Sequence, residues 1–176
     1  MGDLPNARKA FEQALRLQPN DPLTLANIAM LEERQGRPDE AEPLYRAAIL
    51  NIHRATEDQA ADLMFNYALF LNRERRDLDA SAKYYQKCLD INPAHRRALN
   101  NLGCHHLARG DLDVAVEYLD KARRLEPRNA GLLLNLAYAN QRLGKRKQAK
   151  KLAQKAFAIN PKLKQTPLGK LLRQNQ

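Results

Sequence analysis

The sequence predicts an all-α protein, a right-handed superhelical solenoid of antiparallel helix hairpins. Residues 96–129 and 130–163 align without a gap, so that Gly110 meets Gly144 at a period of 34 residues. Apolar and small residues within each copy recur at spacings of three and four, which defines one face of a helix. Each copy also carries a glycine near its middle and a proline near its end, and both residue types terminate helices. Repetition at this period is typical of stacked repeats rather than of one compact core.

The copy at 96–129 shows how one unit is built. Leu99, Leu102 and Gly103 lie on one face of its first helix, and glycine lets a neighbouring helix approach closely there. Gly110 ends this helix, and Pro127 ends the second one. Two such helices joined by a tight turn form an antiparallel pair. Because one pair cannot bury both of its faces, each pair must stack on its neighbours.

The same pattern divides the rest of the chain. We expect a half repeat at 2–21, full repeats at 22–56, 57–95, 96–129 and 130–163, and a capping helix at 164–176. The half repeat contains only a second helix, with Gly2 in the turn position, so the sequence is expected to belong to a longer array. The uncovered face of this helix, between Ala7 and Leu17, is a candidate surface for end-to-end self-association.

The third repeat departs from the pattern in two places. Asn27 and Asn66 are 39 residues apart, five more than the period, and the extra residues lie around 51–59. Either a longer second helix or a loop capped by Thr56 with Asp58 or Gln59 can absorb them. The hairpin turn of this repeat, NRERRDLD, has one extra residue and no glycine.

The unit resembles a tetratricopeptide repeat. The resemblance rests on small residues at Gly103, Ala115 and Ala122, a turn glycine at Gly110 and a closing proline at Pro127, and it recurs in register along the chain. It implies a fold whose first helices line a concave groove. It implies no single activity, because such repeats serve many unrelated systems.

An asparagine ladder is the best functional signal. Asn27, Asn66, Asn101 and Asn135 hold the same place in four successive repeats. The resemblance implies that this place faces the groove, where an amide can both donate and accept hydrogen bonds with an extended peptide. Neighbouring groove positions give an apolar strip with basic edges, suited to a segment with apolar anchors and acidic character: Met30, Phe65, Leu69, Arg73, Arg97, Tyr138 and Arg142. Some members of this family bind the tails of chaperones with a clamp of five polar and basic side chains. We do not expect that function here, because only two of the five corresponding positions hold residues of the same kind.

Charge is unevenly distributed along the chain. The net charge is +10, yet the residues after Glu126 include 12 basic and no acidic side chains. This asymmetry suggests an acidic partner, whether a protein, a nucleic acid or a membrane surface, or alternatively a solubilising terminal repeat. Binding of RNA or another polyanion is the alternative function, with these expected contacts: Lys145, Arg146, Lys147, Lys150 and Lys151.

No chemistry-bearing motif accompanies these features. The sequence contains no glycine-rich phosphate loop, no metal-ligand spacing and no nucleophile motif, so we expect neither an enzyme nor a bound cofactor or metal. No apolar run is long enough to span a membrane. Cys88 and Cys104 belong to no paired motif, which indicates buried thiols in a reducing, cytoplasmic compartment. We therefore expect a non-catalytic scaffold that binds a partner segment in its groove.

Overall fold

The structure is a computed structural model that describes residues 4–174. Over this range it contains α-helices, short 3₁₀ and π-helical turns, and no strand. The all-α prediction and the consecutive helix hairpins are therefore confirmed. The chain divides into two compact units, residues 1–93 and 94–176. A single solenoid through both units stays a prediction, and the turn position predicted for Gly2 lies outside the described residues.

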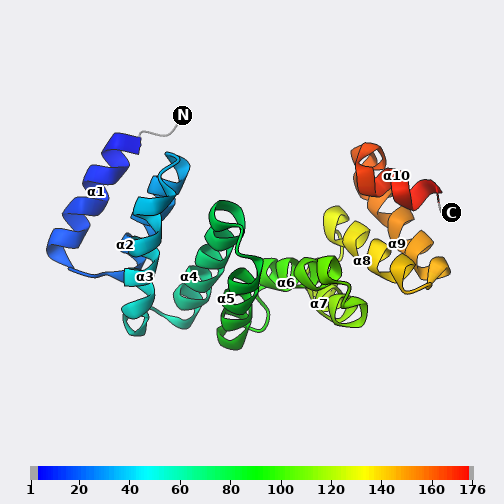
Figure 1. The fold of residues 1–176 in the computed structure, drawn as a ribbon, viewed down its shortest axis with the longest axis horizontal. Coiled ribbons are helices and arrows are strands. Elements are labelled where there is room, and N and C mark those ends of the chain that lie inside the picture. The colour runs from blue at the N-terminus through cyan, green and yellow to red at the C-terminus, as the bar shows by residue number, and fades with distance from the viewer. Residues whose placement is uncertain (1–3, 175–176) are drawn as a thin grey trace. The chain divides into compact units, whose positions relative to one another are not determined.

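Unit 1 is built from two hairpins and a preceding helix (Figure 1). Helix α2 packs against α3, α4 packs against α5, and α1 packs on α2. The two hairpins are also in contact through α2 and α4 and through α3 and α4. The bounds of its helices are α1 (Leu4–Leu17), α2 (Pro22–Arg34), α3 (Pro38–Leu50), α4 (Glu57–Phe70) and α5 (Leu78–Ile91).

Unit 2 repeats the arrangement with two further hairpins, α6 with α7 and α8 with α9. A final helix packs on the second hairpin (Figure 1). The bounds are α6 (Arg96–Arg109), α7 (Leu112–Leu125), α8 (Ala130–Arg142), α9 (Arg146–Ile159), a 3₁₀ segment (Pro161–Gln165) and α10 (Pro167–Gln174). In both units we call the first helix of a hairpin A-type (α2, α4, α6, α8) and the second B-type (α3, α5, α7, α9).

The hairpin turns explain the placement of the glycines. Gly36, Gly110 and Gly144 have φ angles of 71°, 89° and 75°, a left-handed conformation that costs glycine little. The turn between α4 and α5 has no glycine. Its extra residue is absorbed by a π-helical stretch, Leu71–Arg75, and Arg76 then takes the left-handed conformation with φ of 54°. A side chain in this conformation costs about 1–2 kcal/mol.

The other irregularity, around 51–59, is a capped loop rather than a longer helix. Helix α3 ends at Leu50, and a 3₁₀ turn follows at Ile52–Arg54. The Thr56 side chain caps the backbone N–H of Gln59, and the Gln59 side chain accepts from the backbone N–H of Thr56. This reciprocal pair starts α4. The capped-loop alternative is thus confirmed, with Gln59 as the partner of Thr56.

Small residues let the two helices of each hairpin meet closely. Ala41, Ala115 and Ala149 are at most 4% exposed. At Gly103 a Cβ atom would lie 2.7 Å from Cγ of Leu119, so no larger residue fits without moving that side chain. In α5, the residue that corresponds to these three alanines is Ser81, whose buried hydroxyl donates to the carbonyl oxygen of Ala68 at 2.8 Å.

The last helix covers the end of the second hairpin of unit 2. Leu172 of α10 is 3% exposed and packs in a cluster with Leu133, Ala137 and Phe157. Gly169 fits directly over the preceding segment, since a Cβ there would lie 1.9 Å from the carbonyl oxygen of Leu163. The stretch predicted as a capping helix therefore does contain a helix. This helix begins at Pro167 and covers apolar residues of the last hairpin.

Candidate functional site

The asparagine ladder forms one amide pair in each unit. Asn27 of α2 is exposed and Asn66 of α4 is half-buried, and their two helices are in contact within unit 1. Asn101 of α6 and Asn135 of α8 are half-buried, and their helices are in contact within unit 2. All four amides lie on A-type helices and none is enclosed in the core. The structure therefore leaves each of the four asparagines at least partly exposed.

In unit 1, apolar and basic side chains follow the two asparagines along the chain. Met30 and Leu69 are half-buried, and Arg73 is exposed. Phe65, predicted to line the groove, is only 1% exposed and packs against Tyr85 with ring centroids 5.6 Å apart. A side chain this deeply buried has no surface to offer a partner. Phe65 is therefore no longer a candidate contact. Met30, Leu69 and Arg73 remain the predicted contacts in this unit.

In unit 2, Asn135 is hydrogen-bonded to a thiol on the neighbouring A-type helix. The Nδ2 group of Asn135 donates to Sγ of Cys104 at 3.2 Å, which links α8 to α6. One turn further along α8, Tyr138 is half-buried. The guanidinium of Arg142 lies 5.8 Å from its ring centroid, with Nη1 3.5 Å from the hydroxyl. Arg97 of α6 is exposed. Unit 2 thus presents amide, aromatic and cationic groups on its A-type helices.

Neither cysteine has the character of a reactive thiol. Burial raises the pKa of Cys104 to about 11. Burial, with a smaller contribution from the charge of Asp62, raises the pKa of Cys88 to about 12. A thiol must ionise to attack an electrophile or bind a soft metal, so both are poor nucleophiles near neutral pH. Among residues 4–174, no cluster of three or more His, Cys, Asp or Glu side chains could hold a metal ion.

A buried carboxylate that the sequence did not single out ties α1 to the first hairpin. Glu32 of α2 is 2% exposed. Its Oε1 accepts from Nη1 of Arg8 at 2.5 Å, and its Oε2 accepts from Nε of Arg37 at 2.5 Å. The equivalent positions in the next two repeats are Leu71 and His106. The available signal was an acidic residue at a packing position, which requires a basic partner if it is buried.

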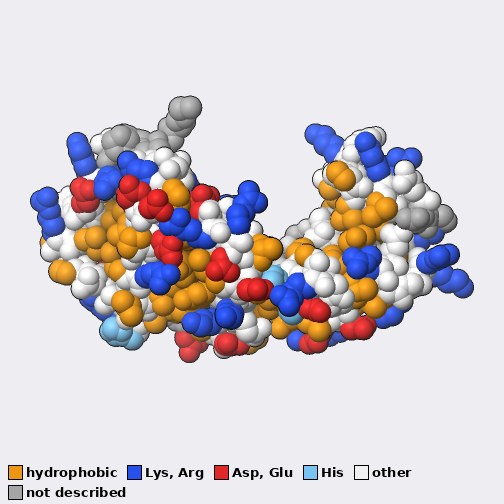
Figure 2. All heavy atoms as spheres, in the orientation of Figure 1, with side chains coloured by type: hydrophobic (Ala, Val, Ile, Leu, Met, Phe, Trp, Pro, Cys, Tyr) orange, Lys and Arg blue, Asp and Glu red, His pale blue; other side chains and the backbone are white. Residues whose placement is uncertain are grey.

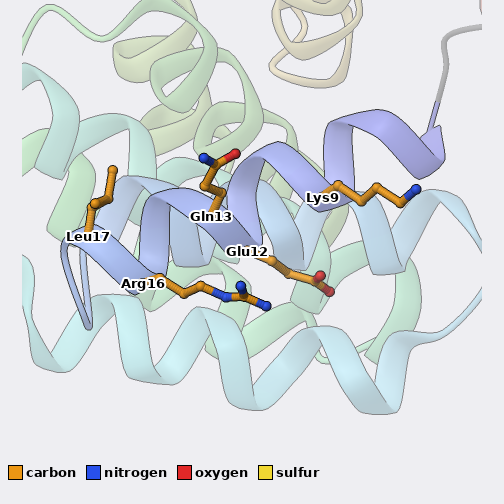
Figure 3. Close-up of a pocket in the computed structure, with 5 residues that line it drawn as sticks. All are labelled: Lys9, Glu12, Gln13, Arg16 and Leu17. Carbon is orange, nitrogen blue, oxygen red and sulfur yellow. The ribbon is translucent and has the colours of Figure 1, made fainter.

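Helix α1 keeps one face open. Ala7, Phe11 and Ala14 are half-buried, whereas the equivalent residues of α3, which include Tyr45 at 1%, are fully buried. Figure 3 shows a shallow depression on α1 lined by five side chains of this helix alone, with Glu12 and Arg16 on one side and Gln13 and Leu17 on the other. With a single helix as its wall, the depression has no enclosed volume for a small ligand. The predicted self-association through Ala7–Leu17 stays a prediction.

The predicted polyanion contacts lie on the outer side of α9 and in the turn before it. Their side chains are all exposed, while Ala149, Ala153 and Ala156 turn inward and are at most 4% exposed. No ion pair within the described part of the chain involves them. Figure 2 shows blue side chains without red ones over the part of unit 2 that holds α9 and α10. The contacts placed here are Lys145, Arg146, Lys147, Lys150 and Lys151.

The fold and these surfaces define a class, the helix-hairpin repeat proteins. Sequence profiles described as tetratricopeptide repeat match residues 1–60 and 72–130, and again 106–174. The chain therefore belongs to the tetratricopeptide repeat family. This family is associated with protein–protein interaction and peptide binding. Over the described residues, none of the helices combines the length and apolar character needed to cross a membrane.

Solved structures agree with this fold. The chain is similar to MamA, at 21% identity and a TM-score of 0.73, covering 94% of this chain and 93% of MamA. It is also similar to YrrB, described as a TPR protein with an unusual peptide-binding site, at 18% identity and 0.73, covering 98% and 84%. PilW, a type IV pilus biogenesis factor, matches at 22% and 0.70, covering 89% and 70%. No curated protein sequence matches the chain.

Proposed function

We propose that this protein is a non-catalytic scaffold whose A-type helices bind an extended segment of a partner protein. The observation that carries the proposal is the amide ladder, with Asn27, Asn66, Asn101 and Asn135 at one register position and all partly accessible. A backbone segment offers alternating N–H and C=O groups, and a carboxamide can pair with both. YrrB, a relative in fold, is described as having a peptide-binding site.

The surroundings of the ladder define the chemistry of the segment. Met30 and Leu69 offer partly buried apolar surface beside the amides of unit 1, suited to apolar anchor residues. Arg34, Arg73 and Arg142 lie near the ends of A-type helices, and all three are exposed. We therefore propose a segment that combines apolar anchors with acidic side chains, because fixed cations at the edge favour a ligand of opposite charge.

The test uses ligands selected from random sequences, because the natural partner is not identified. A phage-displayed library of random 12-residue peptides is selected against the intact chain, and the affinity of each selected peptide is measured by fluorescence anisotropy. Asn101→Ala with Asn135→Ala removes two amides, each worth about 0.5–1.5 kcal/mol of hydrogen bonding, so affinity should fall about tenfold or more. Gln154→Ala, an exposed amide on α9, is the matched control and should change nothing. Unchanged affinity in the double variant would remove the proposal.

The basic surface supports a second proposal, that unit 2 binds a polyanion. The supporting observation is the absence of acidic residues after Glu126 together with 12 basic ones. Counterion release makes such binding strongly dependent on salt. Binding of the intact chain to immobilised heparin, eluted with a sodium chloride gradient, tests it. Elution at the salt concentration of a neutral protein would overturn the second proposal.

A further inference from the structure

Charge is separated between the two units. Residues 1–93 contain 12 basic and 15 acidic side chains, whereas residues 94–176 contain 18 basic and 5 acidic. Four of those five acids are already engaged by nearby cations. Asp111 pairs with Arg109, Glu117 with Lys121, Asp120 with Arg123 and Arg124, and Glu126 with Arg96. Within residues 4–174, no ion pair involves a basic residue beyond Glu126, so these cations are available to an external anion.

The arrangement of these cations favours a linear anion of high charge density. Lys147, Lys151 and Lys155 follow one another at four-residue steps along the exposed side of α9. At about 1.5 Å per residue, successive side chains rise about 6 Å along the helix. A duplex carries one negative charge for about every 1.7 Å of its axis, counting both strands, so several phosphates lie within the length of this row. The row of lysines can therefore contact phosphates of a duplex without an exact register and without any pocket.

The neighbouring elements extend the same charge. Lys162 and Lys164 lie in the 3₁₀ segment that packs on α9, and Lys170 and Arg173 lie in α10. All four are exposed. Lysine acts as a point charge on a flexible stem and fits phosphate groups without demanding one geometry. Contacts of this kind position a nucleic acid but carry no information about its base sequence.

Aromatic residues distinguish between single and double strands. Proteins that hold single strands without sequence preference stack the bases on exposed aromatic rings. On α9, the 3₁₀ segment and α10 the sole aromatic residue is Phe157, and it is 6% exposed. These elements therefore offer nothing on which unpaired bases can stack. A duplex needs no such platform, because its bases are already stacked and its phosphates face outward.

We infer that α9, the 3₁₀ segment and α10 hold the phosphate backbone of a double-stranded nucleic acid without reading its sequence. The inference rests on the proposed polyanion binding and names the class of polyanion. Four or five phosphate contacts should give a plot of log K against log salt with a slope of about −4. Two duplexes of equal length and different sequence should bind equally.

The experiment measures fluorescence anisotropy of the intact chain with four labelled probes at several salt concentrations. The probes are a 24-base-pair duplex, a second duplex of scrambled sequence, a 24-nucleotide single strand and poly-L-glutamate of matched charge. The triple variant Lys147→Gln, Lys151→Gln and Lys155→Gln should reduce the magnitude of the duplex slope by about 2.7, close to 0.9 for each lost contact. The control variant replaces three exposed lysines of unit 1 by Gln and should leave the slope unchanged: Lys9, Lys83 and Lys87.

The outcomes separate this inference from the proposal beneath it. If the duplex binds more tightly than the single strand and poly-L-glutamate, with the expected loss in the triple variant, the inference holds. If none of the four probes binds, both the polyanion proposal and this inference are overturned. If poly-L-glutamate or the single strand binds as tightly as the duplex, polyanion binding survives and the duplex inference is overturned. Equal slopes for the triple variant and the control would also overturn it.

Discussion

The buried carboxylate of Glu32 makes a sharp test of how α1 is held. Its side chain is 3% exposed and contacts two guanidinium groups, Arg8 of α1 and Arg37 at the start of α3. Glu32→Gln keeps the shape and removes the charge. We expect it to lower the free energy of unfolding of unit 1 and to loosen α1 most, because Arg8 has its tertiary contact here.

The magnitude follows from the two contacts. A hydrogen bond to a charged group contributes about 1.5–3 kcal/mol, and the lower value applies because the side chains of Arg8 and Arg37 are 43% and 40% exposed and partly screened by water. In the variant, we expect the carbonyl oxygen of the new carboxamide to keep the bond to Arg37, which is only five residues away, so that its NH₂ group faces the guanidinium of Arg8. The expected cost is therefore about 2 kcal/mol for unit 1, of which about 1.5 kcal/mol falls on the attachment of α1.

Hydrogen–deuterium exchange by mass spectrometry measures this attachment without assuming that both units unfold together. A loss of about 1.4 kcal/mol is a factor of ten, so amides of α1 should exchange about tenfold faster in Glu32→Gln, while α8 and α9 stay unchanged. Glu40→Gln is the control, since Glu40 lines one cleft together with Arg8, Glu32 and Arg37 but is exposed. Unchanged exchange in α1, or the same acceleration in the control, would refute the reasoning.

Three further predictions test the turn, the open helix face and the thiol. Arg76→Gly should raise the free energy of unfolding by about 0.5 kcal/mol in urea titrations followed by circular dichroism, because glycine removes the left-handed strain at some cost in chain entropy; a loss of stability would contradict it. Tyr45→Ala should cost about 3–4 kcal/mol and Phe11→Ala about 1 kcal/mol in the same assay, since the hairpin encloses only Tyr45; equal costs would show that the α1 face is covered in solution, which sedimentation velocity would then reveal as self-association. Cys104, which is only partly buried although the sequence predicted two buried thiols, has a pKa of about 11 against an ordinary 9.0; it should react with iodoacetamide at pH 8 about 100-fold more slowly than a free thiol, and labelling at the free-thiol rate would rule out the raised pKa.

The sequence predicted the hairpins because their geometry depends on local residue types. A left-handed turn favours glycine at Gly36, Gly110 and Gly144, and close helix contact requires a small residue at Gly103. The structure of the turn between α4 and α5 could not be derived in the same way. Its extra residue could have lengthened either helix or the loop, and the π-helical solution that places Arg76 in a left-handed conformation depends on the packing of α4 against α5.

Contacts between residues that are distant in sequence could not be predicted, for a different reason. Arg8 and Glu32 are 24 positions apart, and Asn135 and Cys104 are 31 apart, so no spacing rule links them. Phe65 was placed in the groove because its position precedes the ladder residue. The pattern could not show that the ring of Tyr85 lies close enough to bury it. Periodicity determines which face a residue occupies, while the size of its neighbours decides how much of it stays exposed.

The two proposed functions use different helices of the same hairpin, which makes them separable. In unit 2, Asn135 lies on the A-type helix α8, and the lysine row lies on the B-type helix α9. Each helix turns a small-residue face toward the other, so the side chains that remain exposed belong to distinct surfaces. We therefore expect Asn101→Ala with Asn135→Ala to leave duplex affinity unchanged. The lysine triple variant should likewise leave affinity for selected peptides within about twofold, except for peptides of high negative charge. If the lysine variant weakened neutral peptides as strongly as acidic ones, the two surfaces would be one site, and the assignment of separate functions to A-type and B-type helices would be wrong.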